Sequence, residues 1–123
     1  MDSISRTISN GIVIEKVNLV RATLNEAFEL KDNLTEDGFE YSKIIVDLTS
    51  CDYIDSTFFG ALVYSYKKIS ENDGKMVLVI SDSSLAASFI YKEISSIFDV
   101  YPTVREAIAK LKGSDEEVVS EKY

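Results

Sequence analysis

Residues 52–62 have the sequence Asp-Tyr-Ile-Asp-Ser-Thr-Phe-Phe-Gly-Ala-Leu. The apolar run at residues 44–48 comes shortly before them and predicts a buried strand. The apolar residues that follow have the three-and-four spacing of the inner face of a helix: Phe59, Leu62, Val63, Tyr66 and Ile69. The sequence therefore predicts a strand, a short polar turn, and a helix that begins at residues 55–57.

Asp55, Ser56 and Thr57 are the polar residues at the start of this predicted helix. The first backbone N–H groups of a helix have no partner within the helix, and Asp, Ser and Thr are favoured caps there in any protein. The alternative is that a hydroxyl on this strand-to-helix corner is exposed and can be phosphorylated. The residues alone leave both interpretations open.

The segments before this corner predict a hairpin and a helix. Ile4 and Ile8 indicate an edge strand, and Asn10-Gly11 is typical of a tight turn into a second strand over residues 11–17. Asn18 is expected to cap the next helix. The apolar positions that keep helical spacing in that helix are Val20, Leu24, Ala27, Phe28 and Leu34.

The segments after the corner continue the alternation of strands and helices. The central helix should end at Gly74 in a left-handed conformation, before an apolar strand at residues 75–80. Asp82 or Ser83 can cap a third helix that carries Leu85, Phe89, Ile90 and Ile94, and a short strand follows at residues 97–101. Thr103 and Glu106 have the spacing of a capping box at the start of the last helix.

This order predicts an α/β fold with a mixed sheet of four to five strands and four helices packed on it. The domain should span residues 1–112. Residues 113–123 form an acidic tail with few apolar anchors, which we expect to be disordered.

Composition narrows the classes of function. The chain has 123 residues, with 13 Lys and Arg against 21 Asp and Glu, and a net charge of −8. Nucleic acids and anionic membranes require clustered basic residues, so neither is expected as a partner. No apolar run is long enough to cross a bilayer, and the N-terminus does not resemble a secretory signal, so we expect a cytoplasmic protein.

The chain has no histidine, and Cys51 is its only cysteine. Ser-His-Asp hydrolysis, Cys–His nucleophiles and the common zinc sites are therefore excluded. No phosphate-binding glycine motif occurs, so we expect no metal and no cofactor. One alternative depends on carboxylates: a small enzyme or ligand-binding domain with a metal or nucleotide at Asp52 and Asp55. A receiver domain phosphorylated at Asp47 is disfavoured, because it needs an acidic pair after its first strand and this chain has Asn18-Leu19 after Val17.

The element order, the strand buried on both faces, and the segment Tyr53-Ile54-Asp55-Ser56-Thr57-x-x-Gly60 together resemble the STAS domain of bacterial anti-sigma factor antagonists. The resemblance covers residues 4–111. It includes the entry into the strand at residues 74–79 and the segment at residues 98–107.

The resemblance implies a protein that is not an enzyme but switches between partners. The unphosphorylated form would bind an anti-sigma factor that is also a serine kinase, and this binding would free the sigma factor. Phosphorylation of Ser56 would release that partner, and a phosphatase would reverse the step. The protein would be a monomer or a weak dimer. The alternatives are a STAS-type subunit of a signalling complex without a sigma factor, or a scaffold in which Ser56 is only a cap.

The resemblance also implies that Asp55, Thr57, Phe58 and Asn18 flank or contact the partner. The family usually has glycine where this chain has Phe58, and its Gly-Glu-Leu/Ile-Asp segment is replaced by residues 16–19. Helical spacing predicts that Phe58 points sideways or outward beside Ser56, as a contact residue. Partial burial against the third helix is the equal alternative.

Overall fold

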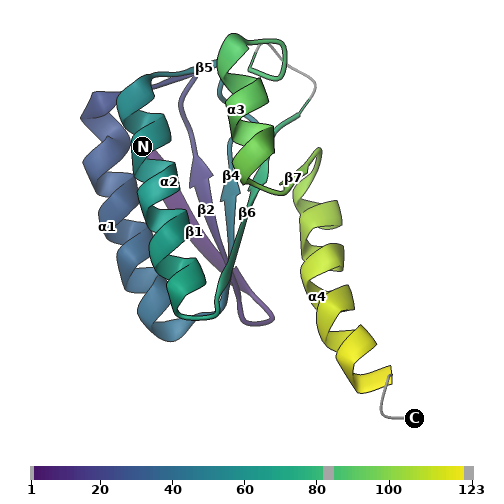
Figure 1. Cartoon of the computed structure of the whole chain (residues 1–123). Coiled ribbons are helices and arrows are strands. Elements are labelled where there is room, and N and C mark those ends of the chain that lie inside the picture. Colours follow the sequence, from purple (N-terminus) through teal and green to yellow (C-terminus); the bar gives the residue numbers. More distant parts are fainter. Residues whose placement is uncertain (1, 82–84, 121–123) are drawn as a thin grey trace.

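The computed structural model describes residues 2–81 and 85–120, and Figure 1 shows its elements in sequence colours. The strands are β1 (Ile4–Ser9), β2 (Ile12–Val17), β3 (Arg21–Ala22), β4 (Lys43–Asp47), β5 (Tyr53–Ile54), β6 (Lys75–Val79) and β7 (Val100–Tyr101). The helices are α1 (Leu24–Glu40), α2 (Ser56–Glu71), α3 (Phe89–Ile97) and α4 (Val104–Ser120).

The main sheet has five strands in the order β1-β2-β4-β6-β7. β1 is antiparallel to β2, and the other neighbouring pairs are parallel. Asn10 and Gly11 have φ angles of 51° and 79°, which are the positive values that a tight hairpin turn requires. The predicted mixed α/β sheet and its N-terminal hairpin are confirmed.

Helices cover both faces of this sheet. Helices α1, α2 and α3 lie on one face and α4 lies on the other (Figure 1). Alternate residues of β4 supply the two cores, since Ile44 and Val46 pack on the first face and Ile45 on the second. This two-sided burial explains why β4 is apolar at nearly every position.

The first helix begins later than predicted. Thr23 caps α1 in a capping box with Glu26, and Asn18 does not cap it. Strand β3 occupies the residues in between, so Val20 lies outside the helix. Val20, Leu24 and Phe28 are exposed, and the buried apolar residues of α1 are instead Ala27, Leu30 and Leu34.

Two other helix ends also differ from the predictions. Asp73, with φ 62°, takes the left-handed conformation after α2, and Gly74 does not. Glycine is needed at position 74 for space, because a Cβ there would lie 2.7 Å from the Ile69 side chain. Helix α3 is preceded by Ser88 as its N-cap, and its first residue Phe89 is fully exposed rather than buried.

The expected caps Asp82 and Ser83 lie outside the described residues. The strand expected at residues 97–101 is shorter, because α3 extends to Ile97 and β7 covers only Val100–Tyr101. Thr103 and Glu106 do interact as expected, with the Glu106 N–H donating to the Thr103 hydroxyl at 3.1 Å. Helix α4 continues into the proposed tail as far as Ser120, residues 121–123 are not described, and disorder of the tail stays a prediction.

A buried pair of acidic residues lies between β2 and α1. Glu15 is 0% exposed and Asp37 is 1% exposed. Arg6 Nε lies 2.8 Å from Asp37 Oδ1 and 3.7 Å from Glu15 Oε2, and Asn33 donates to Glu15 Oε1 at 3.4 Å. The remaining carboxyl oxygens, Glu15 Oε2 and Asp37 Oδ2, accept no hydrogen bond from the described residues. A proton on Glu15 that is donated to Asp37 satisfies this pair.

Burial and the neighbouring Asp37 raise the pKa of Glu15 from its ordinary 4.5 to about 8. The folded state then holds a proton that the unfolded chain has already lost between these two values. The contribution of this proton to the free energy of unfolding should therefore be complete below about pH 4.5. It should decrease as the pH rises toward 8.

We predict that Glu15→Gln flattens this pH dependence. The glutamine amide can accept from Asn33 and donate to Asp37, as the protonated acid does, but it cannot ionise. Urea denaturation should show the variant close to wild type at pH 5 and more stable at pH 8. Glu29→Gln, on the exposed side of α1, is the matched control and should keep the wild-type slope. Parallel pH profiles for wild type and Glu15→Gln would contradict the shared proton.

Candidate functional site: the start of helix α2

The corner between β5 and α2 is held by strand β3. β3 and β5 form a short parallel pair, in which Arg21 lies opposite Tyr53 and Ala22 opposite Ile54. The backbone N–H of Asp52 donates to the Val20 carbonyl at 2.8 Å. On the other side of β5, the Asp55 N–H donates to the Ala22 carbonyl at 3.1 Å. These bonds fix the chain on both sides of β5 just before the helix begins.

Asp55 caps two helices at once. Its Oδ1 accepts the N–H of Phe58, in the first turn of α2, at 2.8 Å. Its Oδ2 accepts the N–H of Leu24, the first residue of α1, at 3.0 Å. The predicted cap at Asp55 is therefore confirmed for α2, and the same carboxylate also joins the starts of both helices. Because both oxygens are occupied by backbone donors, Asp55 is poorly suited to hold a metal ion.

Ser56 and Thr57 are the first two residues of α2, and both are exposed. Their backbone N–H groups are among those that have no partner within the helix. The positive end of the helix dipole favours an anion at this position. The geometry therefore places an accessible hydroxyl where a phosphate group can be tolerated.

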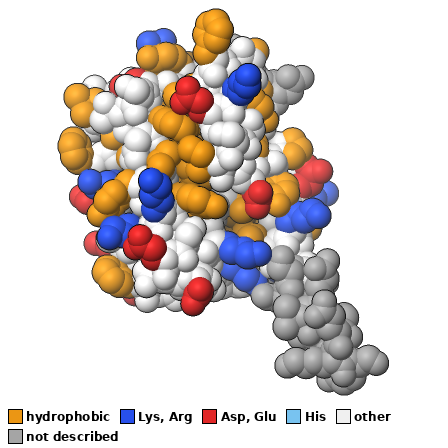
Figure 2. Space-filling model, in the orientation of Figure 1, with side chains coloured by type: hydrophobic (Ala, Val, Ile, Leu, Met, Phe, Trp, Pro, Cys, Tyr) orange, Lys and Arg blue, Asp and Glu red, His pale blue; other side chains and the backbone are white. Residues whose placement is uncertain are grey.

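Exposed apolar side chains surround this corner, and the sequence pattern does not predict their exposure. Val20 is 61% exposed, Leu24 52%, Tyr53 40% and Phe89 100%. The Arg21 guanidinium lies 4.2 Å from the centre of the Tyr53 ring. Figure 2 shows hydrophobic side chains at the end of the molecule where α3 begins. Such a patch is typical of a protein-binding surface.

A hollow of about 490 Å³ lies within this apolar surface, between Tyr53 of β5 and Phe89 of α3. Helical periodicity predicts Phe89 and Val20 on buried helix faces, because a period of 3.6 residues cannot show where a helix begins. Phe89 is the first residue of α3, where no described element covers it. No pattern in the sequence would have revealed the two-residue strands that bring Val20 and Tyr53 together.

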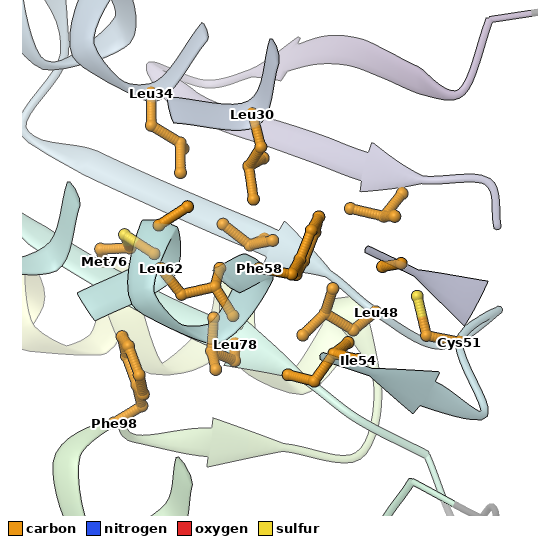
Figure 3. Packing of buried hydrophobic residues seen from close by; sticks show 14 of the residues in the cluster. Leu30, Leu34, Leu48, Cys51, Ile54, Phe58, Leu62, Met76, Leu78 and Phe98 are labelled. Atoms are coloured by element: carbon orange, nitrogen blue, oxygen red, sulfur yellow. The ribbon is translucent and has the colours of Figure 1, made fainter. Parts of the chain in front are cut away.

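Phe58 is not a surface residue, so the prediction that it points sideways or outward is wrong. It is 0% exposed, and Figure 3 shows it in the core among Leu30, Leu48 and Leu62. The other expectation was partial burial against α3, but the burial is complete. The neighbours labelled in Figure 3 come from α1, α2 and the end of β4. The bond from the Phe58 N–H to Asp55 sets the first turn so that its side chain faces the sheet. Phe58 therefore anchors the corner and cannot contact a partner directly.

Asn18 lies after β2, at the same edge of the sheet as the end of β4, since these strands are parallel. Its amide donates to the Asp2 carbonyl at 3.2 Å and to the Ser5 hydroxyl at 3.0 Å. It therefore ties β2 to the N-terminal strand. A contact between Asn18 and a partner stays a prediction.

The carboxylate alternatives find little support in the structure. Asp47 is 5% exposed, lies 3.5 Å from the Lys16 ammonium and accepts the Thr49 N–H at 2.9 Å, which is a structural role. Within residues 2–81 and 85–120, no three acidic or cysteine side chains group as metal ligands. Cys51 is buried, and burial raises the pKa of its thiol to about 12, so the thiolate is not formed at neutral pH.

We predict that Asp55→Ala lowers the free energy of unfolding by about 1–2 kcal/mol, because the Phe58 N–H of α2 and the Leu24 N–H of α1 lose their acceptor. Asp55→Asn should fall between Asp55→Ala and wild type, since the amide keeps one oxygen. Urea denaturation measures both effects. Asp52→Ala, an exposed change in the same turn, is the control and should stay within about 0.5 kcal/mol of wild type. Equal stabilities for the Asp52 and Asp55 variants would contradict the double cap.

Similar folds occur among solved structures. A candidate anti-sigma factor antagonist from Thermotoga maritima has 23% identity and a TM-score of 0.77, over 89% of this chain and 94% of that one. The Bacillus cell fate determinant SpoIIAA in its phosphorylated form has 13% identity and a TM-score of 0.67, over 88% and 98%. A sulfate transporter family protein from Wolinella succinogenes has 20% identity and a TM-score of 0.73, over 89% and 92%. At these identities the likeness concerns the fold alone.

Among curated proteins, none matches the sequence significantly. In the part of the chain that the structure describes, no helix has the length and apolar composition needed to span a bilayer. The sequence profile of the STAS domain matches residues 2–107, which is most of the chain and includes the whole β5–α2 corner. The chain therefore belongs to the STAS domain family.

Proposed function

We propose that this chain is a partner-switching regulator of the anti-sigma factor antagonist type, with Ser56 as its phosphorylation site. In this proposal the unphosphorylated form binds an anti-sigma factor that is also a serine kinase, and thereby frees the sigma factor. Phosphorylation of Ser56 ends that binding, and a phosphatase restores it. The chain itself acts in the cytoplasm as a substrate and a binding module, not as a catalyst.

The observation that carries this proposal is the position of Ser56. Its side chain is exposed at the start of α2, so an enzyme can reach it. The exposed apolar residues Leu24, Tyr53 and Phe89 lie at the same end of the molecule and give a partner a surface to bury. Leu24 is adjacent through its bond to the capping Asp55. A modification at Ser56 therefore falls at the edge of a protein-binding surface.

The physical effect of the phosphate differs between the fold and the interface. A phosphate adds about −1.5 to −2 charges and three acceptor oxygens. At the start of α2, free N–H groups and the helix dipole favour it by about 0.3–1 kcal/mol, so the fold should tolerate it. A partner that covers the apolar surface would have to desolvate a dianion. A loss of only about 2.8 kcal/mol in the free energy of binding weakens the affinity about a hundredfold.

The flanking residues have separate roles in this mechanism. Asp55 holds the corner in place through its bonds to α1 and α2. Thr57 offers a second exposed hydroxyl beside Ser56, for a partner to contact. Phe58 does not contact the partner in this mechanism; its buried side chain anchors the first turn of α2 in the core and keeps that turn rigid.

A second candidate function has the same control of partner binding by phosphorylation of Ser56, but the process that it regulates does not involve a sigma factor. The fold is also that of a sulfate transporter family protein, so the partner can belong to a signalling or transport complex without a sigma factor. The identity of the protein recovered in the experiment below distinguishes the two candidates.

We predict that Ser56→Asp loses the partner while Ser56→Ala retains it. Tagged wild type, both Ser56 variants and the control Ser70→Ala, an exposed serine near the far end of α2, would be recovered from the native cell. Mass spectrometry would identify the bound proteins and the modified residues of the chain itself. Wild type should carry phosphate at Ser56. Ser56→Ala should bind its partner without release, and Ser56→Asp should recover it far less, while both keep the wild-type melting temperature.

Three results would count against this mechanism. Phosphate that maps to Thr57 alone would move the site by one residue. A chain without phosphate, or equal recovery of the partner by Ser56→Asp and Ser56→Ala, would leave Ser56 as a helix residue with no regulatory role.

A further inference from the structure

A groove runs between α1 and α2 on the outer side of the molecule, away from the sheet. Two hollows of about 140 and 250 Å³ follow each other along it, and Tyr64 lines both. Thr57 lies at one end of the groove and Asn72 at the other. Fifteen residues of helix span about 22 Å, so the groove is long enough for about four turns of a helix laid along it.

The groove carries more exposed aromatic surface than two packed helices need. Phe39 is 85% exposed, Phe28 62% and Tyr64 45%; Phe39 lines the larger hollow, Phe28 the smaller one and Tyr64 both. Exposed aromatic side chains around a concave apolar surface are typical of sites that bind another protein.

The charged residues that line the groove are both lysines. Lys31 lines one hollow and Lys68 the other, while the chain as a whole has a net charge of −8. The Lys31 ammonium lies 4.6 Å from the centre of the Tyr64 ring, and that of Lys68 lies 5.8 Å from it. Figure 2 shows Lys or Arg side chains, with Asp or Glu side chains near them, between hydrophobic ones on the side where α1 and α2 lie. Lys68 Nζ also lies 4.0 Å from Glu71 Oε1 on the exposed side of α2, and a ligand carboxylate would compete with that ion pair. The linings of the two hollows contain lysines and no carboxylate, so an acidic ligand is the one that this groove complements.

Two small residues on α2 keep the groove open and polar at its base. A Cβ at Gly60 would meet nothing within 4 Å, so packing does not require a glycine in the middle of this helix, where glycine is unfavourable. Ser65 lines the larger hollow, is 2% exposed, and its hydroxyl has no hydrogen-bond partner among the described residues. A buried hydroxyl without a partner is unusual and suits a site whose ligand supplies one.

We propose that the α1–α2 groove is a second docking surface and binds an acidic amphipathic helix of a protein partner. The apolar face of that helix would pack on Phe28, Phe39 and Tyr64, and its carboxylates would meet Lys31 and Lys68. This is the helix-in-groove mode of recognition, with apolar anchors at i, i+3 or i+4, and i+7. The groove begins at Thr57, next to Ser56, but its binding does not require a change at Ser56.

The test uses pairs of designed helical peptides, titrated into the isotope-labelled protein and followed by NMR. Both members of a pair share the same leucine and phenylalanine anchors, and one is flanked by glutamate and the other by lysine. We expect the acidic peptide to shift the amide signals of residues 27–39 and 57–72, and to bind at least about tenfold more tightly than the basic peptide.

Variants make the result specific to the groove. The double variant Lys31→Glu, Lys68→Glu should reverse the preference between the two peptides. Gly60→Leu should fill the smaller hollow and abolish binding without lowering the melting temperature. Lys67→Glu is the matched control, since Lys67 is exposed on α2 but does not line the groove, and it should bind as wild type does.

Several outcomes would overturn the proposal. These are equal binding of acidic and basic peptides, no shifts in the groove with any peptide pair, or shifts confined to the surface around Tyr53 and Phe89. Self-association in sedimentation that Gly60→Leu abolishes would mean that a second copy of the chain, not an acidic helix, occupies the groove. We expect Ser56→Asp to bind the peptides as wild type does, because the groove does not include Ser56. If the peptides fail to bind the groove, the proposed mechanism at Ser56 is therefore unaffected.

Discussion

The hydrogen bonds of the Asp55 carboxylate determine how the candidate site is built. One oxygen accepts the Phe58 N–H within α2, and the other accepts the Leu24 N–H at the start of α1. Because α1 and α2 are far apart in the sequence, this single side chain sets where the two helices begin relative to each other. The groove between them and the exposed corner above them both follow from that arrangement.

Phe58 extends the same constraint into the core. Its backbone is held by Asp55, and its side chain is fully buried beside Leu30 and Leu62. The two residues that precede it, Ser56 and Thr57, remain in solvent. This turn is rigid because Phe58 anchors it in the core, while the hydroxyls of Ser56 and Thr57 are exposed to solvent. Such an arrangement suits a site whose charge can change while the fold stays intact. Glycine, the usual residue here in the family that the sequence resembles, would lack this anchor.

The two proposed surfaces differ in the chemistry that each recognises. The corner offers apolar side chains beside Ser56, so in the proposed mechanism a phosphate would oppose binding there. The groove offers aromatic rings with Lys31 and Lys68, so negative charge on a ligand favours binding. Both surfaces include the start of α2. A protein with these two surfaces can hold one partner while it exchanges another.

The sequence by itself determined the elements that depend on local patterns. Continuous apolar runs predicted β4 and β6, Asn10-Gly11 predicted the hairpin, and Asp55 was correctly predicted at the start of α2. These predictions succeed because periodicity and capping involve residues near one another in the chain. Only the tertiary structure decided which way Phe58 points, that Phe89 and Val20 are exposed, and that Asp55 also caps α1. These features depend on contacts between distant segments, above all the two-residue pair of β3 and β5, which is too short to leave a pattern in the sequence.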